Sequence, residues 1–187
     1  MNEKEISRRK YYKCKKNQFA PVTDHANDYV FFWKSGSPFS NWHPAKYVHD
    51  GIEFNCSEQG IMWSKAMLFD DENVASAILR CNSTEQKQMK SLGRDVNHFK
   101  ERVWKNNKMS IYHTHCYEKF SQNSPLREKI LETTGKILAE ASPDDRVWGI
   151  GLHEKNAKII IPKKWPGENL LGLLLNNIRD QLTDETI

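Results

Sequence analysis

Glu58 and Lys65 stand seven residues apart in the otherwise largely apolar stretch 55–70, NCSEQGIMWSKAMLFD. In a helix, this spacing places both side chains on one face, two turns apart. A helix that is apolar all round is usually buried, and buried charges are costly unless they are paired or used. The pair therefore fits a carboxylate and a cation that line a pocket. The alternative is that Asn55 caps the helix with Glu58 as its capping-box partner, while Lys65 extends to solvent.

Other polar residues also stand in contexts that favour contact with a ligand. Ser40 and Asn41 place a hydroxyl and an amide between two aromatic residues. Arg94 follows a glycine just past an expected helix end, where a guanidinium group is able to bind a phosphate. Trp104 interrupts the charged face of its expected helix, where the indole is able to stack on a flat base.

Two segments near the C-terminus favour close approach of a ligand to the backbone. Asp145 precedes residues 146–150, RVWGI, which we predict to be a strand in which Gly149 permits close backbone approach. Residues 167–172, GENLLG, begin a helix whose N-terminus is a possible anion site and includes Asn169.

Several classes of protein lack their signatures in this chain. The tetrapeptide His113-Thr114-His115-Cys116 contains three possible metal ligands. At this spacing their side chains do not lie on one face of a helix, and no second cluster completes a zinc site. No P-loop, GxGxxG or GxSxG motif is present. The four cysteines are widely spaced without a CxxC pair, which favours reduced thiols in an intracellular protein. We expect no metal.

The elements expected to position these residues are mostly helical. Residues 29–33 form an aromatic strand, and Asp50-Gly51 predicts a hairpin between residues 45–48 and 52–54. Helices are expected over residues 56–69, 71–80, 83–93, 97–120, 125–131 and 169–182, with Asn97 as one N-cap. Further strands are expected over 136–141 and 146–150, and residues 151–164 are expected to be a loop. These elements predict an α+β fold, a mostly helical single domain with a small antiparallel or mixed sheet.

Composition places the chain among globular proteins. Its 187 residues are 38% hydrophobic and 28% charged, with no apolar run long enough for a membrane span and no secretory signal, so we expect a cytoplasmic protein without a membrane partner. The net charge is +4, and basic residues cluster in the first 16 positions. This arm is either a solvated tail or a contact for nucleic acid.

In combination, seven sequence blocks resemble the YbiA/NADAR (NAD- and ADP-ribose-associated) family. They are FSNWHP (39–44), CSEQGIMWSKAMLF (56–69), SLGRDV (91–96), the helix through Trp104, KFSQNSPLREKIL (119–131), LAEASPDDRVWGIG (138–151) and KWPGENLLG (164–172). The resemblance implies a YbiA-like domain over residues 29–182, a basic extension over 1–28 and a tail over 183–187.

The resemblance also implies site residues and an activity. The catalytic carboxylates fall on Glu58 and Asp145. The substrate-binding positions fall on Ser40, Asn41, Lys65, Arg94, Trp104, Trp148, Gly149 and Asn169, and no metal or organic cofactor is needed. Gly60 stands where relatives often carry an aromatic residue. We expect the absence of a side chain at Gly60 to widen the pocket.

Members of the family look like N-glycosidases that act on ribosyl–nitrogen bonds. The leading hypothesis is therefore removal of ADP-ribose from a modified nucleobase, guanine, in nucleic acid or nucleotide, with the basic arm as a possible nucleic-acid contact. One alternative is a damage-control hydrolase of phosphoribosylamino-pyrimidine intermediates of riboflavin synthesis. Others are a non-catalytic sensor of NAD or ADP-ribose, or a structural protein in which Glu58 caps a core helix.

Overall fold

The computed structural model describes residues 25–185, which form two compact units. We name them for their place in the sequence. The central unit comprises residues 44–119, and the flanking unit combines residues 25–43 with residues 120–185. The expectations for the basic arm before residue 25 lie outside the described residues.

The central unit begins with a β-hairpin. Strand β2 (Tyr47–His49) pairs antiparallel with β3 (Ile52–Phe54), so that Tyr47 lies opposite Phe54. The two turn residues, Asp50 and Gly51, both have positive φ angles of 49° and 80°. This is the backbone of a two-residue turn that favours Asp-Gly because glycine tolerates a positive φ. The predicted hairpin is confirmed.

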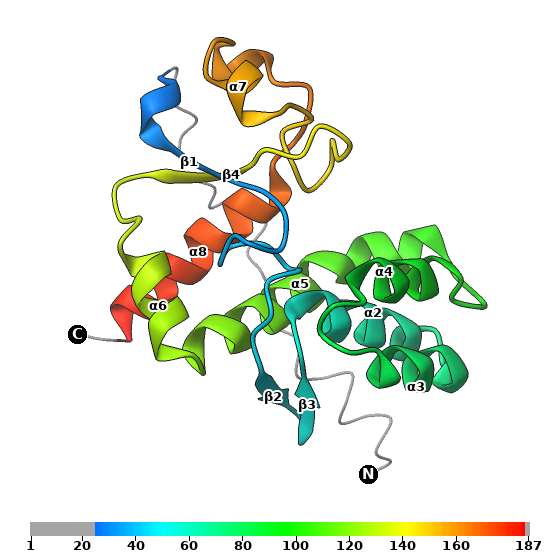
Figure 1. The fold of residues 1–187 in the computed structure, drawn as a ribbon. Coiled ribbons are helices and arrows are strands. Elements are labelled where there is room, and N and C mark those ends of the chain that lie inside the picture. Colours follow the sequence, from blue (N-terminus) through cyan, green and yellow to red (C-terminus); the bar gives the residue numbers. More distant parts are fainter. Residues whose placement is uncertain (1–24, 186–187) are drawn as a thin grey trace. The chain divides into compact units, whose positions relative to one another are not determined.

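Four helices follow the hairpin: α2 (Ser57–Leu68), α3 (Glu72–Arg80), α4 (Gln86–Arg94) and α5 (Glu101–Ser121), the last belonging to the central unit as far as Lys119. Helix α2 lies against both α3 and α4 (Figure 1). A Cβ atom at Gly93 would collide with the Sδ of Met62, so the absence of a side chain lets α4 approach α2 closely. With Ile61, Met62 and Ala66 buried, the prediction of a buried helix is confirmed.

A buried polar cluster joins α2, α5 and the hairpin. The imidazole of His115 lies 3.0 Å from the hydroxyl of Tyr47 through Nδ1 and 2.6 Å from the hydroxyl of Ser64 through Nε2. Burial, and to a smaller extent the neighbouring His49, holds the pKa of His115 well below its usual value. The ring is therefore neutral and acts as a hydrogen-bonding spacer between the elements.

The flanking unit is built on a parallel strand pair. Strand β1 (Tyr29–Phe32) lies beside β4 (Ile137–Glu140), with Tyr29 opposite Ile137, and helix α8 (Leu170–Asp184) lies against β4 (Figure 1). Four leucines of α8 are buried, Leu171, Leu174, Leu175 and Leu182, and the helix predicted over residues 169–182 is confirmed. The unit also contains η1 (Ala26–Asp28), α6 (Ser124–Leu131), α7 (Glu154–Ala157) and η2 (Pro162–Lys164).

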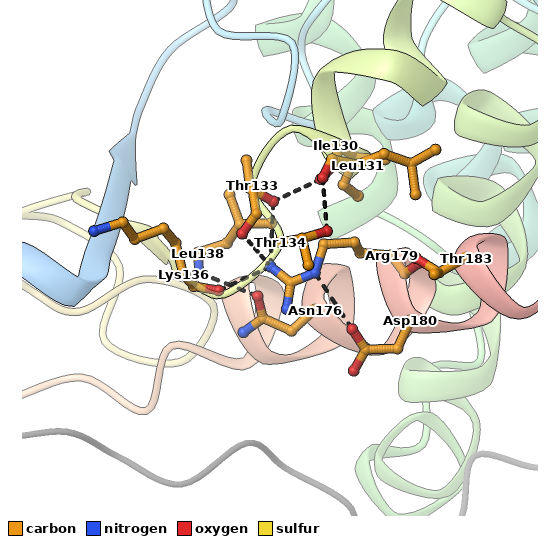
Figure 2. Close-up of polar contacts among 10 residues, drawn as sticks. All are labelled: Ile130, Leu131, Thr133, Thr134, Lys136, Leu138, Asn176, Arg179, Asp180 and Thr183. Atoms are coloured by element: carbon orange, nitrogen blue, oxygen red, sulfur yellow. Dashed lines mark hydrogen bonds and ion pairs between the residues drawn. The ribbon is translucent and has the colours of Figure 1, made fainter.

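Two polar residues of α8 fix the backbone that enters β4. The side-chain oxygen of Asn176 accepts a hydrogen bond from the backbone N–H of Leu138. One turn later, the buried guanidinium of Arg179 donates to the carbonyls of Thr133 and Lys136 at 3.0 and 2.8 Å (Figure 2). These bonds tie the backbone between α6 and β4 to α8 and add to the hydrogen bond that the Thr133 carbonyl already accepts from the N–H of Lys136.

Several boundaries differ from the sequence prediction. Residues 146–150 are not a strand but an irregular segment, and residues 151–164 contain α7 and η2 rather than loop alone. Helix α4 begins at Gln86, with Glu85 as its N-cap, rather than at residue 83 as expected. Asn97 does not cap α5, which begins four residues later, because its backbone and side-chain N–H groups both donate to Asp71. The α+β class with small sheets is confirmed.

None of the described helices is long and apolar enough to cross a membrane. Within residues 25–185, no group of three or more His, Cys, Asp and Glu side chains is arranged to hold a metal ion. The cysteines of this range, Cys56, Cys81 and Cys116, are buried and free of disulfide bonds.

Candidate active site

Glu58 is a buried carboxylate at the start of α2. Its side chain is 5% exposed and lies in the first helical turn, where the helix dipole favours a negative charge. Its neighbours fix the backbone on both sides: the Ser57 hydroxyl donates to the carbonyl of His115, and the Gln59 side chain bonds to the chain around α3. Glu58 therefore stands on a firmly anchored turn.

Gln59 makes the contact that the capping-box hypothesis assigned to Glu58. The N-cap residue is Cys56 rather than Asn55, and the Gln59 side-chain oxygen accepts from the backbone N–H of Asn55 at 2.7 Å. Its amide nitrogen donates to the carbonyls of Ile78 and Cys81 at the end of α3, both at 3.0 Å. Because Gln59 closes the cap, the prediction of Asn55 and Glu58 as a capping pair is wrong.

Lys65 lies two turns after Glu58 on the same helix, about 10 Å further along its axis. Its ammonium donates to the carbonyl of Gly93 at 2.6 Å, and it lies 4.6 Å from the ring centre of Phe99 and 5.3 Å from that of Trp104. The side chain is half-buried, and its ammonium is held by these contacts while part of the side chain stays accessible to solvent.

The electrostatic surroundings of Lys65 favour an anion. Within the described chain, no carboxylate oxygen lies within 4.0 Å of the Lys65 or Arg94 cations. Burial lowers the pKa of Lys65; Glu101 opposes this effect and the positive charge of Arg94 adds to it. Two cations that repel each other, one of them half-buried, gain free energy when an anion binds between them.

The structure thus brings three predicted residues of the central unit together. Lys65 lies against the half-buried ring of Trp104, and Arg94, the exposed last residue of α4 rather than a residue beyond it, acts on Lys65 through its charge. This arrangement offers an aromatic ring and two cations, the groups that recognise a base and a phosphate.

In the flanking unit, Ser40 and Asn41 are buried in a turn, and the Ser40 hydroxyl accepts from the backbone N–H of Trp42 at 3.2 Å. One carboxylate oxygen of Asp145 accepts from the N–H groups of Val147 and Trp148 at 2.9 and 2.8 Å. Asp145 is therefore held as the first residue of a tight turn. The roles of these three residues in substrate contact remain predictions.

The N-terminus of α8 is already occupied by backbone. The N–H groups of Asn169, Leu170 and Leu171 donate to the carbonyls of residues 149, 147 and 148 at 3.0–3.1 Å. The prediction of an anion site at this helix end is wrong, because the irregular segment 146–150 supplies its acceptors. A Cβ at Gly149 would also lie only 2.9 Å from two carbonyl oxygens, so glycine is required there by packing within the unit.

Asn169 holds strand β4 through both ends of its amide. Its oxygen accepts from the N–H of Glu140 at 3.0 Å, and its nitrogen donates to the carbonyl of Leu138 at 2.9 Å. The residue adopts a left-handed conformation with φ 56°, which asparagine tolerates better than most residues. Contact of Asn169, Trp148 or Gly149 with substrate remains a prediction.

Gly60 does not open a pocket. A Cβ atom at this position would collide with the hydroxyl of Tyr47 and the ring of His115. The expectation of a wider pocket at Gly60 is therefore wrong: the missing side chain is replaced by two buried, hydrogen-bonded side chains.

Sequence reasoning missed three residues that shape the central unit. Gln59 was detectable, because it stands three residues after the N-cap Cys56, as a capping-box residue does. Phe99 was predicted to lie inside a helix but lies in the turn before α5. Asp71 accepts a hydrogen bond from Asn97, which is 26 positions away in the sequence. Contacts of that range leave no local sequence signal.

The chain belongs to the NADAR family: the NADAR domain matches residues 31–183. Among relatives, it is 38% identical to N-glycosidase R617 of Acanthamoeba polyphaga mimivirus, covering 82% of this chain and 95% of the relative. It is 34% identical to Protein irg-1 of Caenorhabditis elegans, covering 85% and 82%. The NMR structure of the Escherichia coli protein YbiA matches with a TM-score of 0.69 and 26% identity over 91% of this chain and 92% of that one.

Proposed function

We propose that this protein is an N-glycosidase that hydrolyses a bond between C1 of a ribose and a nitrogen atom. The observation that carries the proposal is the buried carboxylate of Glu58 on the same helix as Lys65, a half-buried cation without a carboxylate partner within 4.0 Å among the described residues. Membership of the NADAR family and the N-glycosidase names of relatives support the reaction class.

The reaction requires a negative group near the anomeric carbon. Cleavage of an N-glycosidic bond develops positive charge at C1, as in the oxocarbenium-like transition state of glycoside hydrolysis. A fixed carboxylate stabilises that charge or activates the attacking water. Glu58 supplies this group, and its anchored turn limits the reorganisation needed during the reaction.

The cationic end of α2 accounts for the rest of the substrate. Lys65 and Arg94 bind phosphate, and Trp104 contacts a flat ring next to it. A sugar that carries a phosphate on one side and a base on C1 fits the separation of Glu58 and Lys65 along the helix. The favoured substrate is an ADP-ribosyl group attached to guanine in nucleic acid or nucleotide.

Base release, followed by liquid chromatography, tests this proposal. The substrates are ADP-ribosylated guanine in DNA, in RNA and as a nucleotide, together with a phosphoribosylamino-pyrimidine. We expect wild type to release guanine and Glu58→Gln to lose at least about 100-fold in rate, as when a group acting on the transition state is removed. Glu72→Gln is the matched control, since Glu72 is an exposed glutamate in the first turn of α3.

The other outcomes separate the alternatives. Release from the amino-pyrimidine alone reassigns the substrate to riboflavin intermediates. Binding of ADP-ribose with no release from any substrate replaces the enzyme with a sensor. If Glu58→Gln only lowers the melting temperature and keeps full activity, the carboxylate is structural and the proposed mechanism is wrong.

A further inference from the structure

Phe99 is an exposed aromatic ring in a segment that the chain fixes firmly. It is 40% exposed, and it is the aromatic member among the large hydrophobic side chains exposed in the described part of the chain. At this exposure a substantial part of the ring's burial energy is not gained on folding. Its placement therefore calls for another reason.

The turn that carries Phe99 is held by a buried carboxylate. Asp71 accepts hydrogen bonds from the backbone and side chain of Asn97 at 2.9 and 2.8 Å, and caps α3 by accepting from Val74. These bonds lower the pKa of Asp71, the backbone N–H of Asn97 having the largest effect. His98, the next residue, takes a left-handed conformation with φ 55°, which costs free energy in a residue other than glycine.

This turn directs Phe99 onto the end of α2. Its ring lies 5.2 Å from that of Phe69 and 4.6 Å from the Lys65 ammonium. Trp104 approaches the same ammonium at 5.3 Å. Two aromatic rings, both accessible to solvent in part, therefore meet at one cation that lacks a carboxylate partner within 4.0 Å among residues 25–185.

We propose that Phe99 is a substrate-binding residue that stacks on a planar purine ring while Lys65 binds the phosphate attached to the same ligand. Every base has a π face, so an exposed aromatic ring beside a cation is suited to a nucleotide. The proposal deepens the proposed function and rests on it for the identity of the ligand. The purine is either the leaving base or the adenine of an ADP-ribosyl group.

Direct binding tests the stacking without requiring turnover. ADP-ribose and ribose 5-phosphate are titrated calorimetrically into wild type, Phe99→Ala, Phe99→Leu and Phe99→Trp. Base–aromatic stacking predicts that Phe99→Ala and Phe99→Leu weaken purine binding by roughly 5- to 100-fold, whereas Phe99→Trp retains it. The Leu variant keeps an apolar cover without a π face, so it separates stacking from a structural role. Leu79→Ala, which truncates another exposed apolar residue of the central unit, is the control.

The two purine sources give different results. Weakened ADP-ribose binding with unchanged ribose 5-phosphate binding assigns Phe99 to adenine. Unchanged ADP-ribose binding with a KM for ADP-ribosylated guanine that rises in both Ala and Leu variants assigns Phe99 to the leaving base. Wild-type affinities and KM in folded Phe99→Ala and Phe99→Leu overturn the inference. If wild type binds ADP-ribose but releases no base, the proposed function fails, while the binding titrations still decide whether Phe99 stacks on adenine.

Discussion

Among the individual residues, Lys65 differs most from an ordinary surface lysine. Its ammonium contacts one carbonyl and two aromatic rings rather than a carboxylate, and burial lowers its pKa. A cation in these surroundings has lost part of its hydration, and the charge of Glu101 only partly offsets that loss. It therefore has more to gain from a bound phosphate than a fully hydrated lysine has.

The lowered pKa predicts how phosphate binding depends on pH. The ammonium binds an anion only when it is protonated, so affinity is present at neutral pH and is lost as pH rises through the lowered pKa, before an ordinary lysine would titrate. The two phosphates of ADP-ribose do not titrate in this range. We expect calorimetric affinity for ADP-ribose to fall between neutral pH and pH 10 in wild type, whereas Lys65→Arg stays flat because guanidinium remains charged.

The same titration contains its own control. Lys65→Gln is expected to bind about 10-fold or more weakly at neutral pH, as loss of a charged hydrogen bond predicts, and to show the same flat profile as Lys65→Arg. Equal pH slopes in wild type and Lys65→Arg would show that another group causes the loss.

Among the elements, helix α2 carries both Glu58 and Lys65, and its position depends on the side chains that surround it. Its first turn is held through Ser57 and Gln59, and the face at Gly60 lies against Tyr47 and His115. Both of those side chains are buried and hydrogen-bonded to each other at 3.0 Å. Neither is able to move away without breaking that bond.

The substitution Gly60→Ala tests this packing. Two effects on stability oppose each other in this variant: the helix propensity of alanine and the crowding by its methyl group. Alanine is favoured over glycine inside a helix by about 1 kcal/mol, while forcing a methyl group into a filled core costs about 1–3 kcal/mol or more. Because the added methyl group would collide with two fixed side chains, we expect a net loss of roughly 1–2 kcal/mol in the free energy of unfolding, measured with urea. Gly36→Ala is the control, since no atom lies within 4 Å of its Cβ position, and it should change stability by less than about 0.5 kcal/mol. A fully stable Gly60→Ala protein would mean that the cluster yields easily.

The elements also show where sequence reasoning succeeds. Asp50-Gly51 specifies its turn through two adjacent residues, and the leucines of α8 specify a buried face through helical spacing, so both were predictable. Residues 146–150 were predicted to form a strand because most of them are apolar. Their carbonyls instead bond to N–H groups some twenty residues later, which no local pattern records.

For the whole chain, the sequence predicted individual helices and strands better than it predicted which strands pair with each other. Strands β1 and β4 were both expected, but they pair in parallel across more than 100 residues, with the central unit between them in the sequence. At the candidate site, the residue types of Glu58, Lys65 and Trp104 were enough to propose them as site residues, and their roles in the reaction stay predictions. The contact of Lys65 with Phe99 and the bond from Asn97 to Asp71 depend on tertiary structure, which the residue types alone do not determine.

The stability of the whole molecule against pH depends in part on a buried lysine. Lys119 in α5 is 1% exposed, and burial lowers its pKa to about 8, while Cys116 and Cys56 act in the opposite direction. Burial likewise raises the pKa of Cys56 to about 11. The folded state therefore favours the neutral forms of both side chains.

The lowered pKa of Lys119 predicts that the free energy of unfolding increases at alkaline pH. Below about pH 8 the lysine is protonated in both states, so its contribution does not change. Between about 8 and its ordinary value of 10.5 the unfolded chain binds more protons than the folded one, so the free energy of unfolding rises with pH. The gap between these values corresponds to roughly 3 kcal/mol.

Urea unfolding at pH 7, 8, 9 and 10 measures this term in wild type and Lys119→Met. Titration of the buried thiol of Cys56 has the opposite sign, because the unfolded thiol loses its proton first and favours unfolding as pH rises. The difference between the two proteins isolates Lys119, since methionine keeps a long apolar side chain without a titrating group. We expect wild type to gain stability relative to Lys119→Met as pH increases from 8 to 10. A constant difference would show that the lysine keeps its proton in the folded protein, held by a counter-charge that outweighs its burial.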